Sequence, residues 1–375
     1  MMRLLGIELR RMWHRRMPRV IVLAGIAGVL VAGGASFFNH DSTVPLVEDR
    51  TAETEAAVAE CRQYSTQDWE RWAAGDTTEI DPEYGLFLAQ FPDAAAYADE
   101  NCRPEYFGDY GIEDHRFCLV TLYEPEVQWR MACPDIEESA GVEHGARGRT
   151  IDIGGTEYRT PKPMGTGIIP ETGFLLFAVA AVIGASFIGA EYKAGTVEST
   201  LLWEPRRISV FGSKLGAAAL TTLAIQVVLL ALLVPAVLPA AFWRGTTAGA
   251  DADFWTGLVG VILRSGIVGA AIAVIALSVS TVTRNTVGGV AVLLGYTAAS
   301  PIFTQVLLKR LRPIDLSENL AVLANGGEVG RFVRNGAGYD IVVAHGVLGA
   351  ALVVAVYVAI AVFIAGVIFA RRDVD

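Results

Sequence analysis

Six long apolar stretches alternate with polar segments along the 375 residues of the chain. A helix needs roughly 20 apolar residues to cross a hydrocarbon core of about 30 Å, and each stretch is close to that length or longer. Helices that are apolar on every face are rare outside a membrane. The pattern therefore predicts an all-α integral membrane protein with six transmembrane helices, in the stretches 20–38, 172–190, 215–243, 254–283, 285–308 and 341–370.

The polar segments complete the predicted domain organisation. The first segment places leucines among arginines, which is typical of an amphipathic helix at a membrane surface; a basic flank with no special role is the alternative. The predicted parts are an amphipathic helix at 1–17, a first transmembrane helix at 18–38, a polar domain at 39–168, and transmembrane helices two to six at 169–375, the last part including a short helix at 194–205 and a short outer segment at 309–340.

The polar domain between the first two spans is predicted to be small and mostly helical. Its helical stretches are 48–74 and 93–101. Polar and apolar residues alternate on both sides of Gly154 and Gly155, which indicates a β-hairpin that leads into the second span. This domain holds 27 acidic and 10 basic residues, a net charge of −17, so the rest of the chain carries +7 of the total of −10. No basic patch typical of a nucleic-acid-binding protein is present.

Basic residues near the spans predict the orientation, because Lys and Arg concentrate in cytoplasmic loops. The first 19 residues contain six Arg, and more follow in the loop at 190–214 and at the C-terminus. We therefore expect both termini to be cytoplasmic and residues 39–168 to be extracellular. A basic cluster at 309–312 opposes this rule, since six spans would place it outside. Only four of the 30 basic residues are Lys, which is typical of a high-GC bacterial genome and indicates a bacterial plasma membrane.

All four cysteines fall within the polar domain and none forms a C-x-x-C pair, so a zinc site has little support. Four cysteines confined to one extracellular domain predict two disulfides, with three pairings open. Four free thiols in a reducing space are the alternative. The residues are Cys61, Cys102, Cys118 and Cys133.

The polar segment between the second and third spans is the most informative part of the sequence. Gly195 can break the preceding helix, and Thr196 can cap a new one with an acid in its first turn. Pro205 then ends that helix. The string resembles the E-x-x-x-G-T-x-E-x-x-L-L-x-x-P-x-R stretch after the second span of ABC-2 type transporter permeases.

This resemblance implies that the segment is the coupling helix that touches a separate ATP-binding subunit. It also implies a permease subunit of an ATP-driven transporter, most often an exporter, which pairs with a second permease subunit in the lipid bilayer, as a homodimer or heterodimer. Two ATP-binding subunits would hold the ATP and magnesium. The implied coupling residues are Glu191, Gly195, Thr196, Val197, Glu198, Leu201, Leu202, Trp203, Pro205 and Arg206.

Motifs for catalysis are missing from the sequence. A Walker A loop needs Gly-Lys-Ser/Thr, and none of the four lysines follows a glycine. There is no H-E-x-x-H sequence and no complete G-x-S-x-G elbow. We therefore expect no catalytic site, cofactor or metal on this chain.

Few polar residues lie within the spans, and these are candidates for the translocation path. Arg264 lies roughly 9 Å inside the fourth span by helix rise, where an ionisable residue is either functional or snorkels to the surface. Glu171 is its candidate partner. Gln226 and Gln305 either line a path or hydrogen-bond helices together.

A second function class fits the same domain organisation. A membrane receptor or scaffold could present the extracellular domain to a ligand without transporting it. A six-span bundle favours the permease interpretation, and an ATPase that binds the chain would distinguish the two.

Overall fold

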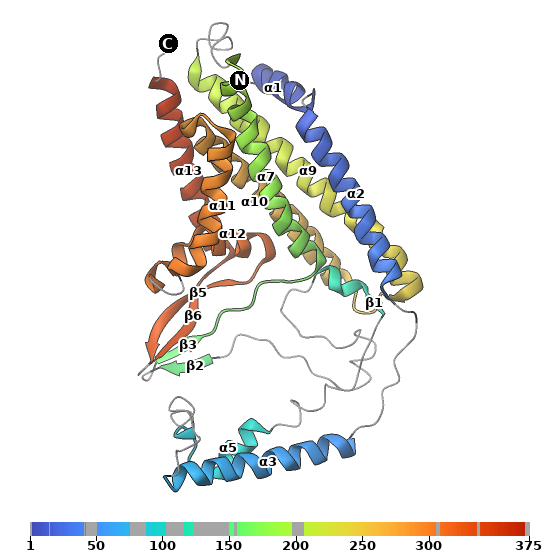
Figure 1. Ribbon diagram of the computed structural model, residues 1–375, viewed down its shortest axis with the longest axis vertical. Helices are drawn as coiled ribbons and strands as arrows, with labels where there is room; N and C mark the ends of the chain where they lie inside the picture. Colours follow the sequence, from blue (N-terminus) through green and yellow to red (C-terminus); the bar gives the residue numbers. More distant parts are fainter. Residues whose placement is uncertain are drawn as a thin grey trace. The chain divides into compact units, whose positions relative to one another are not determined.

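The computed structural model describes residues 2–14, 16–40, 42, 51–75, 88–102, 116–123, 150–153, 156–196, 206–304, 308–335 and 338–371 (Figure 1). The chain divides into two compact units. The larger one, called here the helical unit, comprises Met1–Asp41, Phe117–Gln128 and His144–Asp375. The smaller one, called the disulfide unit, comprises Ser42–Arg116 and Trp129–Glu143. Parts of the predicted domain at 39–168 therefore belong to the helical unit.

The helical unit is a bundle of apolar helices, which agrees with the predicted all-α membrane protein. Among the described residues, five helices are long and apolar enough to cross a membrane: Pro18–Phe38 within α2 (Arg16–Phe38), α7 (Ile168–Lys193), α9 (Arg207–Arg244), α10 (Ala252–Thr283) and α13 (Val347–Arg371). The predicted amphipathic helix at the start of the chain is present as α1 (Met2–His14).

The fifth predicted span differs from the other five. Residues 285–308 were expected to form one helix, but α11 covers only Thr286–Ile302. Its 17 residues give a length of about 25 Å, which is short for a hydrocarbon core. After it come the 3-10 helix η5 (Lys309–Ile314) and the short helix α12 (Leu316–Asn325). By helix length alone, the described chain thus supports five spans rather than six.

Helices α7 and α10 form the centre of the bundle. In the most apolar 18-residue stretch of each helix, 56% of the residues in α7 and 61% of those in α10 are buried, against 11% in α2 and 17% in α13. Small residues allow this close approach. A Cβ on Gly184 would overlap the backbone of Ala273 in α10, and Ala181 and Ala185 are buried beside it.

Three short two-stranded sheets accompany the helices in the part of the chain that the structure describes. In the first, β1 (Phe117–Cys118) pairs in parallel with β4 (Gly245–Thr246). The predicted hairpin before the second span is confirmed, since β2 (Thr150–Ile153) pairs antiparallel with β3 (Thr156–Arg159). The third sheet pairs β5 (Glu328–Asn335) with β6 (Gly338–Gly346) and was not predicted. Strand β6 contains the first residues that were predicted for the last span. The helix of that span, α13, therefore begins at Val347 and not at residue 341.

The disulfide unit contains two helices at the predicted positions, α3 (Thr51–Ala73) and α5 (Ala94–Asn101). A disulfide joins Cys61 of α3 to Cys102 at the end of α5. An ion pair between Arg62 and Asp99, with 2.9 Å between Nη2 and Oδ1, links the same two helices. Of the other two cysteines, Cys118 is also disulfide-bonded, and Cys133 lies outside the described residues.

The Cys61–Cys102 bridge closes a loop of 41 residues, so its loss should destabilise this unit. For Cys61→Ser we expect the free energy of unfolding of the disulfide unit to fall by about 2–5 kcal/mol, because the unfolded chain regains conformational freedom. Limited proteolysis of the whole chain should then cleave near α3 and α5 much faster than in wild type. The control is Gln63→Ser, at an exposed position of the same helix. Equal cleavage rates for the two variants would contradict a stabilising role for the bridge.

Candidate functional site

Helix α7 ends in a left-handed turn where the candidate coupling segment begins. The helix ends at Lys193, and Gly195 has a φ of +66°. The backbone N–H of Gly195 donates to the carbonyl of Tyr192 over 3.2 Å, which closes the last turn. Glycine adopts this conformation without steric cost because it has no Cβ. The helix thus ends where the sequence predicts the break.

Three charged side chains from three helices meet beside this turn. Lys214, two turns into α9, places its Nζ 2.7 Å from Oε2 of Glu191 in the last turn of α7. The same Nζ lies 3.2 Å from Oε1 of Glu8 in α1. These three residues, called here the triad, connect the amphipathic helix to both helices that flank the coupling segment.

The triad is almost completely removed from solvent. The side chain of Lys214 is 1% exposed, and those of Glu8 and Glu191 are 5% and 7% exposed. The ring of Phe187 has its centroid 5.2 Å from the lysine Nζ, within reach of a cation–π interaction. Arg11, which is half exposed, adds a second positive charge 3.7 Å from Oε1 of Glu8.

Burial makes the three charges depend on one another. Taking an isolated charge out of water costs several kcal/mol, and a buried pair recovers this cost only while the opposite charges stay in contact. Lys214 faces two carboxylates, and with Arg11 included the local charges balance. If one helix moved away from the others, it would leave an uncompensated charge in the bundle. The triad therefore favours motion of the three helix ends as one body.

The C-terminal helix reaches the same end of the bundle. Nη1 of Arg207, the first residue of α9, donates to the carbonyl oxygen of Ala370 near the end of α13 over 3.2 Å. Phe211 and Phe369 stack with their ring centroids 5.5 Å apart. Figure 1 shows the N-terminus and α1 at the end of the helical unit where α13 finishes. We call this end, which holds the triad, the triad end.

Only part of the candidate coupling segment is described. Thr196 is helical, and its Oγ1 donates to the carbonyl of Glu191 over 3.4 Å. Arg206 immediately precedes α9 and is exposed. The other predicted coupling residues lie outside the described residues: Val197, Glu198, Leu201, Leu202, Trp203 and Pro205.

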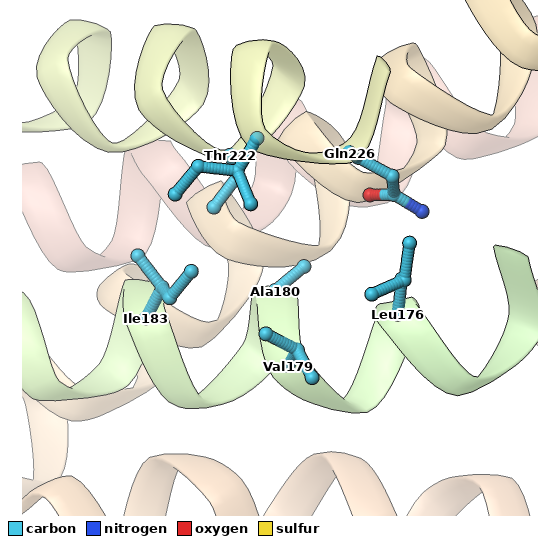
Figure 2. Close-up of a pocket in the computed structure, with 7 residues that line it drawn as sticks. Leu176, Val179, Ala180, Ile183, Thr222 and Gln226 are labelled. Carbon is cyan, nitrogen blue, oxygen red and sulfur yellow. The ribbon is translucent and has the colours of Figure 1, made fainter. Parts of the chain in front are cut away.

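Gln226, a candidate for the translocation path, is buried between helices. Its Nε2 donates to the carbonyl of Gly173 in α7 over 3.4 Å, and a Cβ on Gly269 of α10 would overlap its amide. Figure 2 shows Gln226 and Thr222 of α9 facing Leu176, Ala180 and Ile183 of α7 across a small pocket. The pocket volume of about 10 Å³ is near that of one water molecule. The geometry therefore favours a role for Gln226 in joining helices rather than in lining a substrate path.

The other path candidates do not meet. Arg264 is half buried. Its Nη2 lies near Gly326 at the end of α12, at 3.9 Å from the position that a Cβ on this glycine would take. Glu171, in the first turn of α7, is exposed. The described residues contain no ion pair between Arg264 and Glu171. Gln305 lies outside the described residues.

The buried contact between Glu8 and Lys214 was not predicted from the sequence. Lys214 was used there only as one of the basic residues that indicate the cytoplasmic side of the spans. A helical pattern around it was available. Apolar residues stand three and four positions away on both sides, at Val210, Phe211, Ala217 and Ala218. This spacing places the lysine on the apolar face of a helix. A lysine on such a face needs a buried acid as a partner.

Comparisons with known proteins leave the function to be argued from this geometry. No family model, curated protein or solved structure matches the chain. Within the described ranges, no group of three or more His, Cys, Asp or Glu side chains is arranged to hold a metal ion.

A variant of the triad lysine tests the energetic argument. Lys214→Met keeps the apolar stem and removes the charge, which leaves two buried carboxylates facing no lysine. We expect the free energy of unfolding to fall by about 3–5 kcal/mol, measured as a lower midpoint of thermal or denaturant unfolding in detergent. The matched control is Lys193→Met at an exposed position of α7, for which the change should stay within about 0.5 kcal/mol.

A second set of substitutions separates loss of charge balance from loss of packing. Adding Glu8→Gln and Glu191→Gln to Lys214→Met removes all three charges, so most of the lost stability should return. If Lys214→Met behaves like Lys193→Met, or if the triple variant is less stable than the single one, the triad does not hold the helices as described.

Proposed function

We propose that the chain is the permease subunit of an ATP-driven transporter of the ABC-2 type, and that residues 191–207 couple it to a separate ATP-binding subunit. The triad is the observation that carries this proposal. A coupling segment must pass force to the spans on both sides of it. Here the two helices that flank the segment, α7 and α9, are joined to each other and to α1 by buried ion pairs.

The geometry suggests how the movement would pass from the ATPase into the membrane. Closure of the ATP-binding subunits displaces the segment between Gly195 and Arg206. Because separating the buried charges costs several kcal/mol, α7, α9 and α1 follow together. Helix α7 packs closely on α10 in the centre of the bundle, through Gly184 and Ala273, so the displacement reaches the centre of the membrane part.

The path of the chain supports six crossings with α1 and the end of α13 on the same side, which we assign to the cytoplasm because basic residues concentrate there. A Cβ on Gly189, near the end of α7, would overlap Thr286, so α11 begins near the triad end. At the opposite end of α7, the N–H of Gly165 donates to the carbonyl of Asn325 in α12. Helix α13 then returns to the triad end, where Ala370 accepts from Arg207. This path supports a sixth crossing between α10 and α13, which we assign to α11 despite its length.

The remaining parts of the proposal rest on the sequence resemblance to ABC-2 type permeases. The protein lies in a bacterial plasma membrane and works as an exporter. It pairs with a second permease subunit, and each permease binds one ATP-binding subunit, which holds the ATP and magnesium. The peripheral helices α2 and α13 expose apolar residues suited to lipid or to the second permease, among them Leu23, Val31, Leu348 and Phe363.

Site-specific cross-linking in the native host tests the partner directly. A photoreactive residue at Leu201 or Trp203 should capture a soluble protein that contains a Walker A sequence, identified by mass spectrometry. The control position is Leu348 at the start of α13, which is 84% exposed but lies outside the coupling segment. Captured proteins without an ATP-binding motif at Leu201 and Trp203 would contradict the proposal and favour a receptor or scaffold.

Activity of the purified complex provides the second measurement. Glu198→Lys reverses a charge in the predicted coupling helix, so we expect the transport-coupled ATPase rate to fall by at least about tenfold, since one lost charged contact is worth roughly 1.5–3 kcal/mol. Glu157→Lys makes the same change at an exposed position of β3 and should keep the wild-type rate. Equal rates for the two variants would show that Glu198 does not take part in coupling.

A further inference from the structure

A second pocket lies at the end of the helical unit away from the triad. Its volume is about 270 Å³, far larger than the pocket beside Gln226. Its walls are formed by helix α11, the 3-10 helix η5, Asp315 directly before α12, and Tyr357 of α13. The lining residues are Tyr296, Ala299, Ser300, Phe303, Thr304, Leu311, Ile314, Asp315 and Tyr357.

Asp315 is the charged residue of this pocket, and it is 4% exposed. Its Oδ1 accepts the backbone N–H of Glu318 at the start of α12 over 2.9 Å, and its Oδ2 accepts the hydroxyl of Ser300. No ion pair to Asp315 is present among the described residues. A carboxylate can accept about four hydrogen bonds, so both oxygens keep capacity for a further donor.

Two of the three basic side chains of η5 contact other groups, and the third, Arg310, is exposed. Arg312 donates from Nε to Glu318 over 3.0 and 3.1 Å, and its guanidinium carbon lies 5.1 Å from the ring centroid of Phe332 in β5. Nζ of Lys309 lies 4.4 Å from the ring centroid of Tyr339 in β6. Both side chains therefore pack on the β5–β6 hairpin. The negative charge of Asp315 remains without a cation in the described structure.

Three aromatic side chains are among the lining residues, and hydrogen bonds fix the hydroxyl groups of two of them. The hydroxyl of Tyr296 accepts the N–H of Leu316 over 3.0 Å. The hydroxyl of Tyr357 donates to the carbonyl of Ile314 over 3.1 Å. Phe303 adds a third ring, half exposed. Ring faces attract cations through their quadrupole, and recognition of ammonium ligands commonly uses aromatic walls.

We propose that this pocket binds an organic ammonium group, with Asp315 as its counter-charge and the rings of Tyr296, Tyr357 and Phe303 as its walls. A buried carboxylate is stable when it is paired, and an ammonium ligand supplies the missing charge. Aromatic walls fit an alkylated cation better than a metal ion, because calcium and magnesium require six or more oxygen ligands. The ammonium group is carried either by a small soluble amine or by the head group of a lipid. This assignment does not depend on the proposed transport function.

Choline and its uncharged isostere 3,3-dimethylbutan-1-ol test the charge directly. We expect the purified full chain in phosphatidylglycerol nanodiscs to bind choline at least about tenfold more tightly than the isostere, since a desolvated cation–π contact alone is worth up to about 2 kcal/mol. Asp315→Asn keeps the shape and the acceptor for the N–H of Glu318 but removes the charge. Choline should bind this variant at least about tenfold more weakly than it binds wild type, because the counter-charge is lost while the aromatic rings remain.

A filled pocket provides the steric test. Ala299→Leu adds a side chain to the pocket wall and should reduce choline binding by at least about tenfold, as expected for a blocked site. Ala298→Leu makes the same change at the neighbouring exposed position, which does not line the pocket, and should bind choline as wild type does. Thermal unfolding midpoints of both variants confirm that they fold.

Two lipid compositions distinguish the sources of the ammonium group. If lipid head groups occupy the pocket, phosphatidylcholine in the nanodiscs should compete with free choline and weaken its apparent binding relative to phosphatidylglycerol. If soluble amines are the ligands, the two compositions should give the same affinity. Equal binding of choline and its isostere, or unchanged choline binding in a folded Asp315→Asn variant, would overturn the assignment.

Discussion

A single lysine between two buried carboxylates holds the triad end of the helical unit together. Lys214 contacts Glu8 and Glu191 at 3.2 and 2.7 Å, and all three side chains are almost fully buried. Because a buried charge without its partner costs several kcal/mol, α1, α7 and α9 are fixed relative to one another where the chain leaves the bundle for the coupling segment. The left-handed turn at Gly195 sets the point at which that segment begins.

Close packing carries this constraint into the bundle. Helices α7 and α10 approach through Gly184 and Ala273, and Gln226 adds a hydrogen bond to the backbone of Gly173. At these contacts the helices have little room to slide past each other, because no side chain separates the backbones of α7 and α10. A displacement of this end of α7 would therefore move the centre of the bundle. The Asp315 pocket lies away from this route, which makes it a separate site.

Much of the fold was predictable because long apolar runs and helix ends are local signals. The break at Gly195, the α3 and α5 helices and the hairpin ending at Arg159 all follow from short patterns of residues. The β5–β6 hairpin was missed although Asn335 and Gly336 are a common hairpin turn pair. The short α11 was missed because composition does not show where an apolar run stops being helical.

The candidate site was harder to predict, since its residues are distant in sequence. Glu8 and Lys214 are 206 positions apart, and only the packing of α1 on α9 brings them together. The proposed ion pair between Arg264 and Glu171 is absent from the described residues, because the depth of a residue along its helix does not fix which neighbouring helix it faces. Similarly, Asp315 becomes a pocket residue only when η5 turns the chain back against α11 and α13.

The movement of the triad helices as one body is tested most directly by a distance between α1 and α9 in the proposed complex with an ATP-binding subunit. Spin labels at Ile7 and Ile208, both exposed, report this distance by pulsed electron resonance without and with trapped ATP. The account predicts the same narrow distribution in both states for wild type, and a broadened one for Lys214→Met. A wild-type distance that changes with ATP, or an unchanged distribution in Lys214→Met, would contradict movement of the triad helices as one body.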